Sequence, residues 1–407
     1  MSAAGRRPRP ARSVDERSAW IALAAVDGVG ETRFGRLIGA LGGAEAVLEA
    51  ATQGRVEDAR RAMETEAHVR LDLATVENIR AAARDPLQVE RRMQQLSVWA
   101  LTPLDAGYPP RLRELDPAPA VLFGQGDQDA VRADGSVAVV GTRRPTLVGR
   151  ALAARVATRL VECGTIVFSG LAIGIDGAAH AATLDAGGRT VAVIGGGHAH
   201  PGPRAHRAMV ERILATGGAM IGELAPDAPP TRGTFPRRNR LISVLTDATI
   251  VIEAPLRSGA LITARHALEQ GRSVLAAPGR PGDPSTAGCL ALLRETPARP
   301  FVGLDELVVD LDLLGPRSPA GTAVRPADLD ADTALRLLGP AERAVAERLS
   351  RGPASADALI ADTGLTPAVA SGAVMLLLLR GWVQSVGPAY LAAGPLVRRS
   401  SGRGGAA

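Results

Sequence analysis

A series of short apolar segments separated by stretches of helical length constrains the fold of this chain most strongly. The first of them, Val137–Val140, is followed by a stretch from Leu147 to Cys163 that is long enough for a helix. Apolar strands that alternate with helices predict a parallel, doubly wound α/β sheet of the Rossmann-like kind. We expect strands at 137–140, 165–168, 190–194, 219–221, 248–252 and 273–277.

Three of the predicted strands end in glycine or Ser-Gly, at Gly141, Ser169-Gly170 and Gly195-Gly196. The carboxyl ends of parallel strands meet at one edge, where open α/β sheets bind ligands. Glycine exposes backbone amides there, and helix N-termini add partial positive charge, so this edge suits phosphate. There is no strict G-x-G-x-x-G after the first strand and no G-x-x-x-x-G-K-[ST] sequence. A dinucleotide site and a P-loop ATPase therefore lose support.

The run Gly233–Arg240 combines three arginines, one asparagine and one phenylalanine within eight residues. We interpret it as a loop stiffened by Pro236, which leads into the apolar Leu241–Ser243. The planar guanidinium groups match phosphate oxygens, and the ring of Phe235 offers a face on which a base can stack. Taken alone, the run is equally compatible with a solvated basic loop.

Arginine is concentrated where the glycine motifs lie. Between Val137 and Pro300 there are 19 arginines and 11 acidic residues, a net charge of +8, whereas the whole chain carries +5. All 47 basic residues are arginine, and a GC-rich coding bias explains that usage without any function. Packing against a helix end is the alternative for the two arginines that follow the first strand. The candidate phosphate-binding arginines are Arg143, Arg144, Arg232, Arg237, Arg238 and Arg240.

The flanking segments predict further domains. In the N-terminal segment, Gly28-Val29-Gly30 precedes a helix, as in helix-hairpin-helix and related SAM-like modules, although a turn without ligand fits equally well. Near the C-terminus, three helices and a two-stranded hairpin follow in the order of a winged helix. We therefore predict a disordered basic arm (1–16), an N-terminal helical module (17–96), a Rossmann-like domain (97–312), a linker (313–337), a winged-helix domain (338–394) and a disordered tail (395–407).

Two cysteines, Cys163 and Cys289, provide neither a disulfide framework nor a zinc site and suit a reducing compartment. No signal peptide is visible, and the longest strongly apolar run, 373–379, is too short to cross a bilayer. We therefore expect a cytoplasmic protein without membrane insertion.

The sequence around the histidines favours structural roles over metal binding or catalysis. Asp176 stands four residues before His180, and we interpret the aspartate as a helix cap and structural brace. His198, His200 and His206 are interpreted as isolated loop residues, because they lack further ligands. We expect no metal, no other cofactor and no catalytic residue.

At these motifs the chain resembles the DNA-processing protein A family, also called Smf. The resemblance covers about 160 residues in order. The chain departs from the family pattern at Ile173, where a polar residue is common, and at His200, His206 and Cys289. The matching motifs are Gly141-Thr-Arg143, Ser169-Gly-Leu-Ala-Ile-Gly-Ile-Asp176 with His180, Gly195-Gly-Gly197, Phe235-Pro-Arg-Arg-Asn-Arg-Leu-Ile-Ser243 and Ser258-Gly-Ala-Leu-Ile-Thr-Ala264 through to Pro278-Gly279.

This resemblance implies a protein that binds and protects single-stranded DNA and loads RecA during natural transformation. It also implies a homodimer formed through the Rossmann-like domain and no enzymatic activity. Asn239 is expected to brace the basic run. The implied DNA-binding residues are Arg143, Arg144, Ser169, Gly170, Gly195, Gly196, Arg232, Phe235, Arg237, Arg238 and Arg240.

Two alternatives remain open on the sequence. A Rossmann-like nucleotide-binding enzyme or sensor would use Glu223 or Glu253, each at a strand end, as a base. A duplex-DNA regulator would use the third winged-helix helix, 366–380, but that segment has one arginine and is typical of a packing helix.

Overall fold

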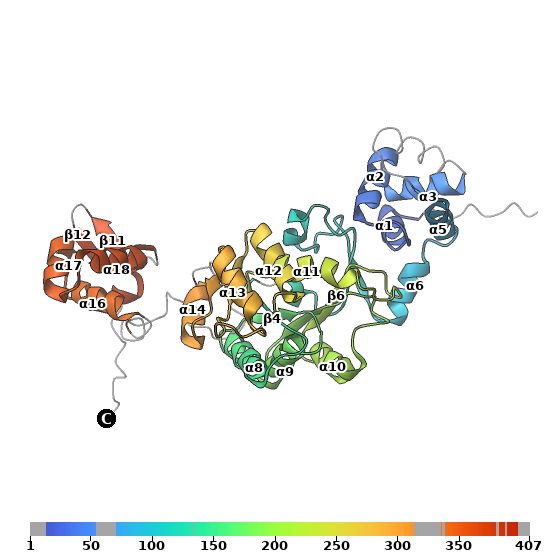
Figure 1. Cartoon of the computed structure of the whole chain (residues 1–407). Coiled ribbons are helices and arrows are strands. Elements are labelled where there is room, and N and C mark those ends of the chain that lie inside the picture. Colours follow the sequence, from blue (N-terminus) through green and yellow to red (C-terminus); the bar gives the residue numbers. More distant parts are fainter. Residues whose placement is uncertain are drawn as a thin grey trace, which may run out of the picture. The chain divides into compact units, whose positions relative to one another are not determined.

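The computed structural model of the chain describes residues 14–53, 71–132, 134–312, 335, 338–379, 382–386 and 389–397. Within it the chain forms two compact units, Met1–Val302 and Gly303–Ala407 (Figure 1). Residues 1–13 of the predicted arm, residues 398–407 of the predicted tail and the predicted linker, except Leu335, lie outside the described residues. The domain boundaries set out above stay predictions.

The first unit is built on a nine-stranded sheet with the order β1-β2-β6-β5-β4-β3-β7-β8-β9. The strands from β3 to β9 run parallel, and β1 and β2 form an antiparallel edge. The six predicted strands are confirmed, whereas the short β1, β2 and β9 were missed. The bounds are β1 (Trp99–Leu101), β2 (Leu122–Gly126), β3 (Ser136–Val140), β4 (Ile166–Ser169), β5 (Thr190–Val193), β6 (Ala219–Gly222), β7 (Ala248–Val251), β8 (Ser273–Ala276) and β9 (Arg299–Pro300).

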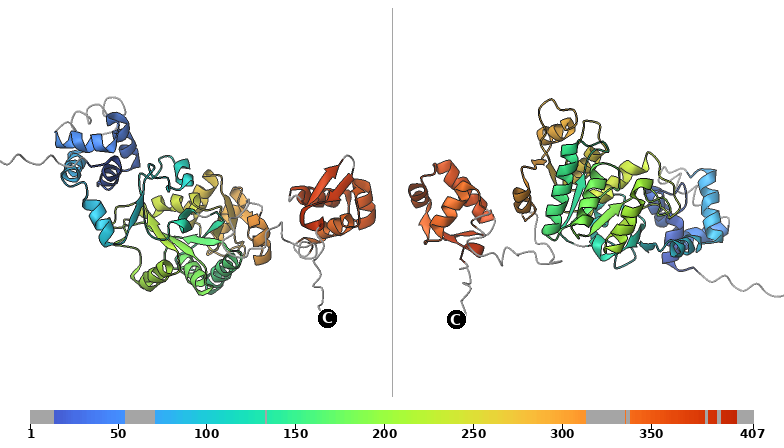
Figure 2. Two further views of the ribbon diagram at one scale, coloured as in Figure 1. Left: turned by 180° about the vertical axis from the view of Figure 1, so that it is seen from behind. Right: turned by 90° about the horizontal axis from the view of Figure 1, so that it is seen from below.

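Helices cover both faces of this sheet (Figures 1 and 2). Side chains alternate along β5: Val191 packs in the same core as Leu241, whereas Ala192 packs with Ile213 on the other face. This confirms the doubly wound, Rossmann-like fold. One face carries α8 (Leu147–Glu162), α9 (Ile175–Asp185) and α10 (Arg207–Ala215), and the other carries α11 (Thr234–Val244), α12 (Ala260–Glu269) and α13 (Ala287–Glu295).

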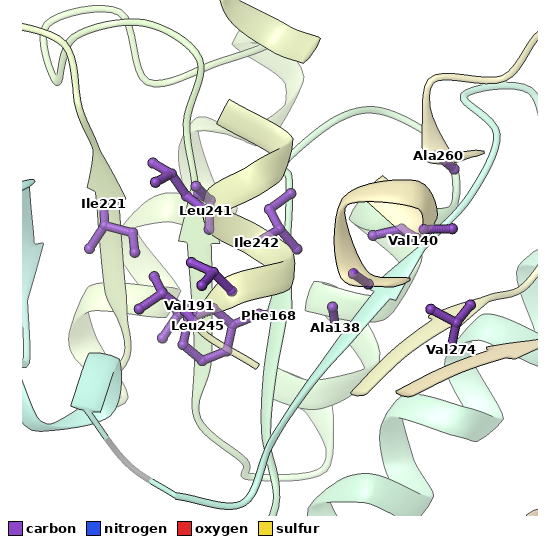
Figure 3. Packing of buried hydrophobic residues seen from close by; sticks show 14 of the residues in the cluster. Ala138, Val140, Phe168, Val191, Ile221, Leu241, Ile242, Leu245, Ala260 and Val274 are labelled. Carbon is purple, nitrogen blue, oxygen red and sulfur yellow. The ribbon is translucent and has the colours of Figure 1, made fainter. Parts of the chain in front are cut away.

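The basic run is a helix, which corrects the prediction of a loop. It forms the first turns of α11, and Pro236 is tolerated there because the first amides of a helix have no intrahelical acceptor. Figure 3 shows Leu241, Ile242 and Leu245 of α11 packed against the sheet near Phe168. The apolar second half of the helix therefore anchors its polar first half at the carboxyl edge of the sheet.

The N-terminal helices pack into the same unit as the sheet. Ile21 shares a buried cluster with Phe123 of β2, and the Trp20 indole donates to the Ala120 carbonyl at 2.7 Å. The helices are α1 (Glu16–Ala24), α2 (Glu31–Leu41), α3 (Ala44–Thr52), α5 (Leu73–Arg84) and α6 (Gln88–Gln95), and the short elements α7 (Asp129–Arg132), η1 (Pro110–Glu114) and η2 (Arg204–His206) lie farther along.

The second unit has the predicted winged-helix arrangement, with one addition. Its described strands form a three-stranded sheet, β10-β12-β11, where only a two-stranded wing was expected. Gly364 ends α17 in the left-handed conformation with φ 67°, as predicted for a stop. The elements are α14 (Leu304–Asp312), α16 (Pro340–Leu349), β10 (Ala354–Ser355), α17 (Ala356–Thr363), α18 (Pro367–Leu379), β11 (Val383–Val386), β12 (Ala389–Ala392) and η3 (Gly394–Val397).

Among the described residues, no single helix is long and apolar enough to cross a membrane. The bent pair α17 and α18 passes the same test of length and composition, a weak signal that buried helices also give.

Candidate functional site

Two cavities open at the carboxyl edge of the parallel strands. The first, which we call the switch-point cavity, has a volume of about 610 Å³ and lies between the loops that follow β3 and β7. Here the strand order reverses, the position at which open α/β sheets bind ligands. The second, the glycine-turn cavity, has a volume of about 510 Å³ and is lined by the loops that follow β4 and β5, together with Arg204 and Arg207.

Arg143, Phe235 and Arg238 line both cavities and form the wall between them. The Arg143 guanidinium carbon lies 5.3 Å from the centroid of the Phe235 ring. A Cβ on Gly195 would come within 2.9 Å of that ring, so Phe235 is held closely from both directions. Phe235 is half-buried with the exposed Arg143 over its ring, and stacking of a base on Phe235 stays a prediction.

Arg238 is the buried cation of the site. Its Nε donates to the Asn239 side-chain oxygen at 3.1 Å, and the Asn239 amide donates to the Gly259 carbonyl at 3.3 Å. Its Nη atoms have no acceptor among the residues that the structure describes. Burial lowers the pKa of Arg238 to about 10, with Asp176 opposing the shift and Arg143 adding to it. The guanidinium thus stays charged at neutral pH, and it lines both cavities beside the Asp176 carboxylate.

Asp176 organises the loop after β4 instead of capping the helix, which corrects the predicted cap. The cap position of α9 is Gly174, and the buried Asp176 carboxylate accepts a hydrogen bond from the Gly170 amide at 3.1 Å. Burial raises the pKa of Asp176, while Arg238 and the loop amides oppose that shift.

Ser169 and Gly170 do not offer the amides that were predicted for them. Ser169 is fully buried, lines neither cavity and donates its hydroxyl to the Val139 carbonyl at 2.6 Å. The Gly170 amide is already bonded to Asp176. A side chain at Gly170 would collide with Arg238, so this glycine provides space for the guanidinium.

The turn after β5 presents backbone amides to the glycine-turn cavity. Gly195 and Gly196 line it, and their amides have no acceptor in the described part of the chain. A Cβ on Gly195 would meet Phe235, and one on Gly196 would approach Pro230 within 3.1 Å. The close packing requires glycine and leaves two neighbouring N–H groups for an anion.

The loop after β3 carries exposed arginines on a rigid base. Thr146 donates its amide and its hydroxyl to the Glu253 carboxylate at 3.0 and 2.6 Å, and the Thr142 amide donates to the Glu253 carbonyl at 2.7 Å. Arg143 and Arg144 lie between these two anchors, exposed at the switch-point cavity. Arg232 is also exposed at this cavity.

Arg237 and Arg240 point away from both cavities, contrary to prediction. Helical phase places them on the opposite side of α11 from Phe235 and Arg238. Arg240 pairs with the buried Glu223 at 2.5 Å, and Arg237 pairs with Glu223 at 3.1 Å. Both arginines also pair with Glu31, and Arg240 donates to the Pro117 carbonyl.

Glu31 was not found by sequence reasoning, because nothing local marks it as a partner of α11. It is the first residue of α2, directly after the Gly28–Gly30 turn, and it links the N-terminal helices to the core. The Gly28–Gly30 turn, where a phosphate could meet the N-terminus of the following helix, thus lies close to two arginines that already have acidic partners. Burial raises the pKa of Glu223 to about 7, with Arg240 opposing and Glu31 adding to the shift.

His180 and His198 serve the fold, whereas His200 and His206 line the glycine-turn cavity. The buried His180 has its Nδ1 2.7 Å from the Thr190 hydroxyl, and burial lowers its pKa to about 3. Burial likewise lowers the pKa of His198 to about 4, and its Nε2 lies 3.1 Å from the Met220 carbonyl. Within the described ranges, no three His, Cys, Asp or Glu side chains gather as they would around a metal ion.

The fold and these cavities define a Rossmann-like protein with two arginine-lined cavities at the carboxyl edge of its sheet. The chain belongs to the DNA recombination-mediator protein A family, whose profile matches residues 99–312. The profile of the winged-helix domain of DprA, the family's short name, matches residues 326–387.

Relatives and a solved structure agree with this membership. The putative DNA processing protein DprA of Mycobacterium tuberculosis H37Rv is 41% identical over 276 residues, which cover 67% of this chain and 68% of that protein. Protein Smf of Escherichia coli K12 is 42% identical over 48% of this chain and 52% of its own length. The X-ray structure of DNA processing protein A from Streptococcus pneumoniae matches with a TM-score of 0.59 and 30% identity, over 72% of this chain and 97% of that one.

Proposed function

We propose that this protein binds single-stranded DNA along its carboxyl edge and acts in the cytoplasm as a recombination mediator that protects incoming DNA and loads RecA. The observation that carries the proposal is the Arg238 guanidinium, buried between two cavities and lacking an acceptor for its Nη atoms within the described residues. Such a preorganised cation favours a polyanion whose phosphates reach into both cavities. Membership of the DNA recombination-mediator family supports the same ligand.

The shape of the site favours a single strand over a duplex. Both cavities lie between loops, and we propose that the nucleotides of an unpaired strand enter them more readily than those of a duplex. The proposed contacts are sequence-neutral, since they come from guanidinium groups and glycine amides directed at phosphate. The residues we propose for phosphate contact are Arg143, Arg144, Arg232, Arg238, Gly195 and Gly196.

Non-catalytic action is part of the proposal. Glu253 accepts hydrogen bonds from the loop after β3, and Glu223 is held by two arginines, so both candidate bases already have structural partners. A purified sample that hydrolyses nucleoside monophosphates would favour the enzyme alternative.

The winged helix is proposed to contact proteins instead of duplex DNA. Its helix α18 carries no charged side chain between Pro367 and Leu379, and a duplex reader needs donors to phosphates and base edges.

The proposal is tested by measuring fluorescence anisotropy of labelled oligo-dT and of a duplex of equal length over a range of salt concentrations. We expect tighter binding of the single strand, with log K falling linearly with log salt at about 0.7 per phosphate neutralised. Equal affinity for the duplex would contradict the proposal.

Light scattering with and without oligo-dT tests the proposed homodimer. A faster assembly of RecA on single-stranded DNA in the presence of the protein is the expected result for loading, and an unchanged rate would remove that part of the proposal.

A further inference from the structure

Four large apolar side chains stand exposed on the segments that carry or adjoin the lining residues of the switch-point cavity. Leu147, Val148, Leu256 and Ile173 are 87%, 77%, 63% and 52% exposed. They belong to the segments that follow β3, β7 and β4, and these three strands are neighbours in the sheet. We call Leu147, Val148, Ile173 and Leu256 the aliphatic rim.

The rim is held in place by the contacts that fix the loops. Thr146, the residue before Leu147, bonds to Glu253, three residues before Leu256. Gly174, next to Ile173, lies so close to the Thr142–Arg143 backbone that a Cβ there would collide with it. These side chains are therefore exposed on an ordered surface instead of on a solvated tail.

Charge decides which partner this surface fits. The exposed arginines Arg143 and Arg144 lie on the same loop as Leu147, a few residues before it, and Arg257 directly follows Leu256 and lines the switch-point cavity. The two acidic residues of these segments, Asp176 and Glu253, are buried and bonded. A surface that is both apolar and cationic matches a chain of anionic groups joined to apolar faces, the chemistry of an unpaired nucleic-acid strand.

We propose that the aliphatic rim contacts the bases of single-stranded DNA while the neighbouring arginines hold its phosphates. This inference rests on the proposed function and adds a second kind of contact to it. Phe235 has Arg143 over its ring, and aromatic residues make up only 2% of the chain, so exposed aliphatic side chains near these arginines are available as further base contacts. Aliphatic contact does not distinguish one base from another, which suits binding without sequence preference.

The test compares oligo-dT with an abasic phosphodiester strand of equal length and charge. We expect the wild-type protein to bind oligo-dT roughly tenfold more tightly than the abasic strand at the same salt concentration, in the range of a base contact. The triple variant Leu147→Ser, Val148→Ser, Leu256→Ser is expected to lose this preference while it keeps the abasic affinity and its salt slope. Ile173 is left unchanged because it also lines the glycine-turn cavity.

The matched control replaces Leu73, Leu87 and Leu104, which are 70%, 42% and 52% exposed and line neither cavity. This control should keep the wild-type preference. A rim variant that keeps the preference, or wild-type protein that binds both strands equally, would overturn the inference and leave the proposed function standing. If the rim variant loses affinity for oligo-dT and for the abasic strand equally and also changes its molecular mass, the rim contacts a second copy of the chain. That outcome would overturn the inference as well. Wild-type protein that binds neither strand would instead defeat the proposed function.

Discussion

The arginines on the two sides of α11 differ in their partners: one side faces the cavities, and the other forms ion pairs within the protein. Arg238 faces the cavities and its Nη atoms lack acceptors among the described residues, whereas Arg240, two positions on, pairs with Glu223 and Glu31 and donates to a carbonyl. Arg240 faces two carboxylates and a carbonyl, whereas Arg238 is balanced by the single carboxylate of Asp176, so we expect the first side to attract a polyanion more strongly. The comparison teaches that an arginine-rich run has no single role once it becomes a helix.

The largest expected effect tests the cavity side. Replacing Arg238 by Met should weaken single-strand binding by about 100-fold, since a hydrogen bond to a charged group contributes roughly 1.5–3 kcal/mol. Anisotropy of labelled oligo-dT at fixed salt measures this. The variant is made together with Asp176→Asn, so that no buried carboxylate is left without its cation.

Two further variants complete that comparison. Asp176→Asn alone should fold and keep most of its affinity, and Arg238→Lys should recover part of the binding through its charge. A double variant within about threefold of the wild-type affinity would show that Arg238 is structural only, because a direct contact is worth more than that.

The second effect tests the paired side through pH. The folded-state pKa of Glu223, about 7, lies above the ordinary value of 4.5, so its contribution to stability is present below pH 4.5 and is lost as pH rises through 7. Glu223→Gln should therefore gain stability relative to the wild type, by about 2 kcal/mol between pH 5 and pH 8. Urea unfolding of both proteins across this range measures the difference.

The measurement compares the free energies of unfolding of the wild type and the Glu223→Gln variant, because two histidines change the stability of each protein with pH in the opposite direction to Glu223. His180 and His198 have lowered pKa values in the folded state, so their contribution is lost as pH falls below about 6.5. Both are unchanged in the variant, and their contribution cancels. A difference that does not vary with pH would show that the arginines keep Glu223 ionised.

The smallest expected effects come from replacing one arginine at the cavities and one on the paired side of α11. Arg143→Ala should weaken binding about tenfold and reduce the salt slope by about 0.7, because it removes one phosphate contact. Arg237→Ala should leave the slope unchanged and lower stability by less than about 1 kcal/mol, since its half-exposed ion pairs are screened by water. Salt titrations and urea unfolding of both variants check this. Equal changes of slope would erase the distinction between the sides of α11.

Much of the framework was predictable because it follows local rules. The six buried strands were predicted from short apolar runs, and the winged helix from the order of three helices and a hairpin. The missed strands β1, β2 and β9 are three, five and two residues long and depend on their neighbours for pairing. Two or three residues carry too little pattern to be recognised alone, and β2, although as long as β3, contains two glycines and a glutamine that interrupt its apolar pattern.

The sequence by itself determined the doubly wound sheet, its glycine-ended strands and the concentration of arginine near them. Only the tertiary structure decided which groups remain available at that edge. It paired Arg237 and Arg240 with Glu31, about 200 positions away, bonded the Gly170 amide to Asp176 and covered Phe235 with Arg143. The physical reason is range: strand and helix formation depends on neighbours in the chain, whereas the partners of a charged side chain depend on contacts that exist only after folding.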